Sequence, residues 1–159
     1  LFDTGFRIRE IIDMKSSQIR QGYFVVYGKG RKERVVPQNA IVSKWLMKYE
    51  RARDSYFQYK RAEDCYFLSK NGRRLTPEAV NKFMKKAASA VGVNPLVRVS
   101  PHTCRHTFAH QELKNGLDLY SLSRLLGHES VSITQRYLEA VRDEQVLTSA
   151  RNTGVLAHL

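Results

Sequence analysis

The sequence predicts a mainly α-helical domain with a small antiparallel β-sheet near its start. Two observations predict helices. A proline follows Thr76 and Ser100, as at the first position of a helix, and leucines recur at helical spacing over residues 119–126 before Gly127. A third predicts the sheet, because strand-forming residues flank a charged, glycine-bearing turn at residues 28–33.

The first elements form a short helix and a hairpin. Residues 7–12 read as a helix after the break at Thr4-Gly5. Residues 18–27 are rich in strand formers, and residues 34–36 return as a strand that Pro37 closes. The sequence therefore places an antiparallel pair of strands early in the chain.

The middle of the chain begins with a helix, indicated by apolar residues four positions apart at Ile41, Trp45 and Tyr49. Residues 51–64 show no clear periodicity. Residues 65–69 are interpreted as a short strand that ends at an Asn71-Gly72 turn.

Five further helices are predicted after residue 75. The first opens at Thr76-Pro77 and ends near Gly92, and the second opens at Ser100-Pro101 and stops at Asn115-Gly116. The leucine-rich helix follows and ends at Gly127. Beyond it, Ser132 and Gln135 fit a capping box for a short helix that holds Tyr137, and residues 143–150 form a last helix.

The bulk composition suits one globular domain over residues 1–159, with 42% hydrophobic residues. The chain opens at Leu1 without a methionine, so we expect a piece of a longer protein that is cut short at its start.

The chain is strongly basic. Its 27 Lys and Arg outnumber 15 Asp and Glu, which gives a formal net charge of +12 and favours a polyanionic partner, either nucleic acid or an acidic membrane surface. No apolar run is long enough to span a membrane. Two cysteines make no disulfide framework and fit the cytoplasm.

Candidate chemistry centres on the helix that opens at Ser100. His102 and Arg105 share a face of its first turn, where free N–H groups and the helix dipole favour an anion such as phosphate. Alone, that pair is more typical of a solvated helix face. A zinc site among His102, Cys104, His106 and His110 is an alternative, but on a helix Cys104 points away from the histidines and no carboxylate completes the set.

Other candidates are scattered along the chain. Gly127 turns the backbone so that His128 leaves the helix end, and Tyr137 follows in a separate helix, where core packing is the ordinary alternative. The hairpin tip carries Lys29, Arg31 and Lys32, which can reach into a DNA groove but, taken alone, are more typical of an exposed charged turn. Near the start, Arg7 and Glu10 are spaced for an intrahelical ion pair.

Taken in order, these segments resemble the tyrosine recombinase family, also called phage integrases, in its Xer-like and transposon or phage branch. The resemblance runs from about Thr4 to Tyr137 and fills six family positions: Arg7, Lys29, His102, Arg105, His128 and Tyr137. Glu10 matches an acidic residue that supports the family's site. The resemblance implies the DNA breaking-rejoining catalytic fold, with no metal and no cofactor.

The resemblance also implies a role for each residue. Tyr137 attacks the scissile phosphate and forms a 3′-phosphotyrosyl intermediate, while Arg7, Arg105 and His128 bind the charged oxygens. His102 is the candidate general base and Lys29 the general acid. A second strand's 5′-hydroxyl then attacks the phosphotyrosine, which completes strand exchange.

The resemblance implies double-stranded DNA as the partner, a homotetramer on DNA for the full-length protein and a monomer for this piece, in which the family's N-terminal DNA-clamping domain is absent. Residues 146–159 are candidates for docking on a neighbouring protomer. Three alternatives stay open: DNA relaxation of the type IB topoisomerase kind, a DNA-binding module without catalysis, and a metal-dependent phosphodiesterase, which the missing carboxylates disfavour.

Overall fold

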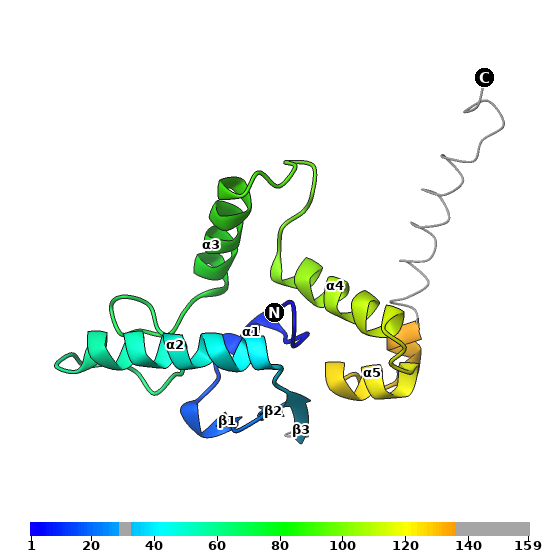
Figure 1. Ribbon diagram of the computed structural model, residues 1–159, viewed down its shortest axis with the longest axis horizontal. Helices are drawn as coiled ribbons and strands as arrows, with labels where there is room; N and C mark the ends of the chain where they lie inside the picture. Colours follow the sequence, from blue (N-terminus) through cyan, green and yellow to red (C-terminus); the bar gives the residue numbers. More distant parts are fainter. Residues whose placement is uncertain (29–32, 136–159) are drawn as a thin grey trace. The chain divides into compact units, whose positions relative to one another are not determined.

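A computed structural model describes residues 1–28 and 33–135 of the chain. The chain divides into two compact units, Leu1–Phe108 and Ala109–Leu159. The first unit holds the sheet and most of the helices, and the helix α4 (Pro101–Lys114) begins in it and ends in the second (Figure 1). The prediction of one domain over residues 1–159 stays a prediction.

The sheet has three antiparallel strands in the order β1 (Ile19–Arg20), β2 (Tyr23–Tyr27) and β3 (Glu33–Pro37). The strand formers at residues 18–27 thus divide into two strands, because the chain reverses at Gly22, whose φ of +85° is unfavourable for residues with a side chain. Two short helices precede the sheet, α1 (Ile8–Ile12) and η1 (Ser16–Gln18).

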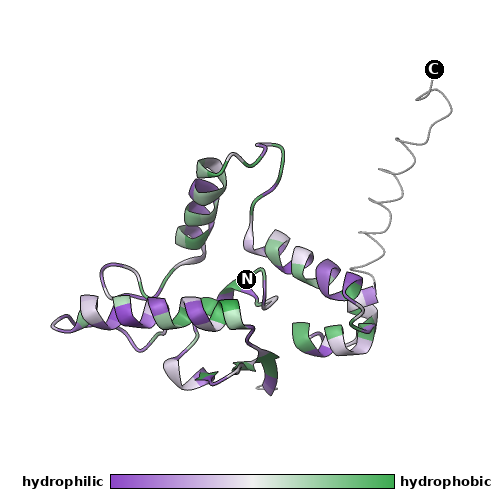
Figure 2. Cartoon of the chain, in the orientation of Figure 1, coloured by the Kyte–Doolittle hydropathy of each residue, from purple (hydrophilic) through white to green (hydrophobic). Residues whose placement is uncertain are grey.

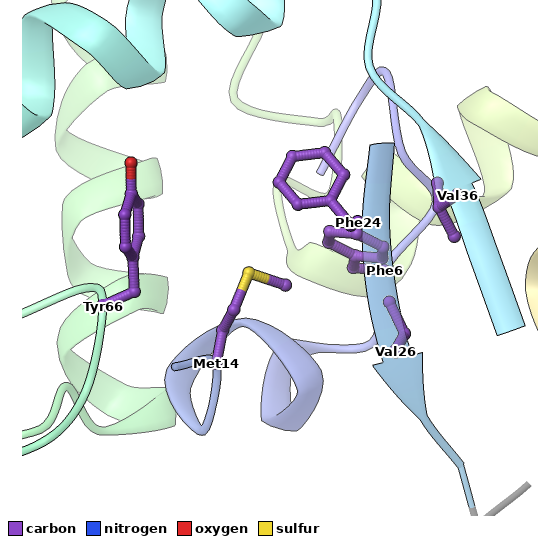
Figure 3. Packing of buried hydrophobic residues seen from close by; sticks show 6 residues of the cluster. All are labelled: Phe6, Met14, Phe24, Val26, Val36 and Tyr66. Atoms are coloured by element: carbon purple, nitrogen blue, oxygen red, sulfur yellow. The ribbon is translucent and has the colours of Figure 1, made fainter. Parts of the chain in front are cut away.

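One face of the sheet forms the core of the first unit. Alternate residues of β2 and β3 point to this face, where Phe24, Val26 and Val36 are almost fully buried. Phe6 packs edge-to-face on Phe24 with ring centroids 5.1 Å apart. Figure 3 shows these side chains together with Met14 and Tyr66. The core therefore fixes the segment around Phe6, next to the candidate Arg7, against the sheet.

The helix α2 (Ala40–Phe57) is longer than its apolar spacing indicated. Asn39 caps it by accepting a hydrogen bond from the Val42 amide at 2.8 Å. Ile41 and Trp45 are more than 60% exposed, whereas the Tyr49 hydroxyl donates to the Tyr66 carbonyl at 3.1 Å. The helix continues beyond residue 51 without an apolar stripe, so periodicity alone did not reveal its end.

The predicted strand at residues 65–69 is wrong. Only one isolated bridge forms there, between Leu68 and Arg74, across the expected Asn71-Gly72 turn. Gly72 has a φ of +72°, and a Cβ at this position would lie 2.5 Å from the Arg61 carbonyl oxygen. The Arg61 backbone thus packs tightly against the turn, and the residues on either side of the turn form no regular ladder.

The two helix starts with proline are confirmed. In α3 (Pro77–Ala90), Thr76 accepts a hydrogen bond from the Ala79 amide at 3.1 Å, and Ser100 accepts one from the Thr103 amide at 3.2 Å at the start of α4. Figure 2 shows hydrophilic and hydrophobic residues alternating along α3. No helix in residues 1–28 and 33–135 is long and apolar enough to cross a membrane.

The second unit contains the end of α4 and the helix α5 (Leu119–Leu126), which Asp118 caps. Gly127 ends α5 in the left-handed conformation, as expected. The next helix starts at residue 131 because Ser130 accepts from the Ser132 amide at 3.2 Å, so the predicted capping role of Ser132 with Gln135 is wrong. The helix predicted at residues 143–150 and the docking segment at 146–159 lie outside the described residues.

Candidate active site

Arg7 is held at the start of α1 by Glu10. One guanidinium nitrogen of Arg7 donates to Glu10 Oε1 at 2.9 Å, and the Arg7 backbone amide donates to Oε2 at 2.8 Å. The Arg7 side chain is 42% exposed, whereas that of Glu10 is 8% exposed. The carboxylate is thus a buried anchor for a side chain that is itself partly exposed.

Arg34 is a second, buried partner of the same carboxylate. Its two terminal nitrogens donate to Glu10 Oε1 and Oε2 at 2.8 and 2.7 Å, in a bidentate pair with both side chains under 10% exposed. Sequence reasoning did not identify this role. The strand alternation contained the signal, because Arg34 lies two residues from the inward-facing Val36 and a charge at an inward position needs a buried counter-charge.

The two arginines keep Glu10 ionised. Burial alone would raise the pKa of this carboxyl, but the hydrogen bonds and charge of Arg34, together with the hydrogen bonds of Arg7, outweigh burial and lower the pKa below its ordinary value. Glu10 therefore carries its negative charge throughout the neutral range and positions Arg7.

Arg105 reaches the same segment of chain from α4. It is 5% exposed, and its guanidinium donates to the Gly5 carbonyl at 2.6 Å across 100 residues of sequence. Gly5 has a φ of +57°, which turns the backbone between Thr4 and Phe6. Since Gly5 lies two residues before Arg7, one short segment positions both predicted phosphate-binding arginines.

His102 lies one turn before His106 on α4, and their Nε2 atoms are 2.8 Å apart. The zinc alternative gains no support from the described part of the chain, which contains no group of three or more potential metal ligands. Cys104 is buried, and burial raises the pKa of its thiol, which opposes the thiolate that a metal would need.

His128 leaves the end of α5 as predicted. Its backbone amide donates to the Ser123 carbonyl at 3.1 Å, and its Nδ1 lies 2.8 Å from the Thr134 hydroxyl, which is fully buried. This contact orients the imidazole ring within the second unit. The convergence of His128 with the two arginines of the first unit stays a prediction. The remaining predicted site residues lie outside the described residues: Lys29, Arg31, Lys32 and Tyr137.

Comparison with known protein families matches residues 1–144 to the phage integrase family. The chain is 37% identical over 145 residues to tyrosine recombinase XerD of Oceanobacillus iheyensis, covering 89% of this chain and 48% of that protein. For tyrosine recombinase XerD of Listeria monocytogenes serotype 4b, identity is 36% with the same coverage. The chain therefore spans about half the length of the curated relatives it matches.

Solved structures confirm the predicted fold class. The XerA recombinase is similar to this chain with a TM-score of 0.75 and 28% identity, covering 92% of this chain and 54% of that one. The XerH site-specific recombinase, solved with its difH substrate in a pre-cleavage complex, gives a TM-score of 0.72 at 25% identity, covering 85% and 39%. The mainly helical domain with a small antiparallel sheet is thus the catalytic fold of tyrosine recombinases.

Proposed function

The chain belongs to the phage integrase family, and we propose that it is the catalytic part of a site-specific recombinase that cleaves and rejoins DNA through Tyr137. One observation carries the proposal. Arg7 and Arg105 lie near opposite ends of the first unit in sequence, yet residues 5–10 position both of them. The Glu10 carboxylate holds Arg7, and the Gly5 carbonyl holds Arg105. The Glu10 carboxylate, which accepts hydrogen bonds from Arg7 and Arg34, orients a partly exposed arginine, and arginine is favoured for bidentate recognition of phosphate.

In the proposed reaction, the Tyr137 oxygen forms a bond to the scissile phosphorus while the bond to the 5′ oxygen breaks. The two guanidinium groups and His128 donate hydrogen bonds to the nonbridging oxygens, on which negative charge grows in the transition state. The phosphotyrosyl bond stores the energy of the broken phosphodiester, so rejoining requires no external energy source.

Two proton transfers accompany the exchange of bonds. An unperturbed tyrosine has a pKa of about 10, so attack at neutral pH requires a base, and we assign that role to His102. The departing 5′ oxygen receives a proton from Lys29. Rejoining reverses both transfers, when the 5′-hydroxyl of a second strand attacks the phosphotyrosine.

Double-stranded DNA is the proposed partner, which a net charge of +12 supports. The first unit also has an open groove of about 940 Å³ between α3 and residues 93–100, and the exposed Lys82, Lys85 and Arg98 are among its lining residues. Arg31 and Lys32 of the hairpin are proposed to contact DNA as well. We propose a homotetramer on DNA for the full-length protein and a monomer for this chain alone.

The test is covalent trapping on a pool of nicked duplexes with randomised half-sites, in which a released fragment prevents rejoining. The wild-type chain should form an adduct that survives denaturation, and peptide mapping should place the nucleotide on Tyr137. Tyr137→Phe should still bind DNA but form no adduct, whereas the control Tyr59→Phe, at a 91% exposed position, should react like wild type. EDTA should not change the yield. An adduct in Tyr137→Phe would refute the assignment.

A further inference from the structure

His102 contacts His106, a histidine that has no role in the proposed mechanism. The Nε2 atoms are 2.8 Å apart, and the ring centroids are 4.3 Å apart with the planes perpendicular. At this distance the two nitrogens share one hydrogen, so one ring donates and the other accepts. Two imidazolium rings cannot form the bond, because both would donate.

His106 is the ring suited to accept. It is half-buried, and burial lowers its pKa, to which the positive charges of His102 and Arg105 add in the same direction. All three residues lie on α4. The lowered pKa favours a neutral His106, and a neutral ring can accept a hydrogen bond from the exposed His102 through a lone pair on Nε2.

We propose that His106 is a positioning residue for His102, whose Nε2–H it accepts so that Nδ1 of His102 takes the catalytic proton. The inference rests on the proposed function of His102 as base. During attack, the proton moves from the Tyr137 oxygen to Nδ1 of His102. His102 becomes an imidazolium that still donates through Nε2 to the neutral His106, so the ring keeps its orientation in both protonation states.

Two variants of His106 separate positioning from packing. His106→Gln removes the ring but keeps an acceptor oxygen close to the place of Nε2, and His106→Phe keeps the ring and removes its nitrogens. If His106 positions His102, single-turnover adduct formation should stay within about 3-fold of wild type in the Gln variant. It should fall about 10- to 100-fold in the Phe variant, as for other groups that orient a functional imidazole. Equal rates, or a faster Phe variant, would overturn the proposal.

The tautomer of His102 gives a readout that does not depend on cleavage. Long-range ¹H–¹⁵N spectra of the ring nitrogens should place the proton of neutral His102 on Nε2 in wild type and in His106→Gln, and distribute it over both nitrogens in His106→Phe. A proton on Nδ1 in wild type would overturn the proposal even if Tyr137 forms its adduct. If no adduct forms at Tyr137, the proposed function fails, and the spectra still decide whether His106 sets the tautomer.

Discussion

Replacing Glu10 with glutamine should destabilise the first unit by about 3 kcal/mol at pH 7. The bidentate pair with Arg34 has both side chains under 10% exposed, and removing one partner of a buried pair costs about 3–5 kcal/mol. The pair with Arg7 adds only about 0.2–1 kcal/mol, because Arg7 is 42% exposed. Glutamine keeps one acceptor oxygen, which places the sum near the lower end of this range.

The assay is urea unfolding followed by circular dichroism, with the free energy of unfolding taken from the midpoint and slope. The pH dependence gives a second check. Because the pKa of Glu10 is lowered on folding, its stabilising contribution is present above the ordinary value of 4.5 and is lost as the pH falls through the folded value. The stability difference between wild type and Glu10→Gln should therefore shrink in acid.

A double-mutant cycle with Arg34→Met tests the origin of the effect. Removing both charges leaves no uncompensated ion, so the double variant should be less destabilised than the sum of the single variants by at least about 1 kcal/mol. A loss below about 1 kcal/mol in Glu10→Gln, or additive single effects, would refute the reasoning that a buried carboxylate holds both arginines.

Two further predictions concern catalysis and DNA binding. Lys29→Ala should cleave slowly on ordinary DNA but near the wild-type rate when a bridging sulfur replaces the 5′ oxygen, since a thiolate leaves without a general acid. Failure of this rescue in single-turnover assays would contradict the role of Lys29. The variant K82A/K85A should make the fall of the log DNA-binding constant with log salt concentration shallower by about 2, because each lost phosphate contact removes about 0.9 from the magnitude of the slope. The equally charged control K44A/K48A on α2 should keep the wild-type slope, and equal slopes for the two variants would argue against the groove.

Local chemistry was predictable from the sequence wherever a few neighbouring residues decide the structure. The helix starts at Thr76 and Ser100 are each fixed by one capping side chain, and the helix end at Gly127 by a glycine that has none. The local sequence alone therefore reveals them. The strand predicted at residues 65–69 failed because strand-forming residues alone do not supply a pairing partner, and the segment forms only the isolated bridge between Leu68 and Arg74 while the Arg61 backbone packs against the turn. Such a contact leaves no trace in the local pattern.

The candidate site depends on the register of the hairpin in a way that connects fold and function. Val26 pairs with Arg34 and Phe24 with Val36, so the same alternation that buries the apolar residues turns Arg34 inward to Glu10. A slip of one residue would turn Arg34 outward and leave Glu10 without its bidentate partner. Correct packing of the sheet is thus a condition for orienting Arg7 through Glu10.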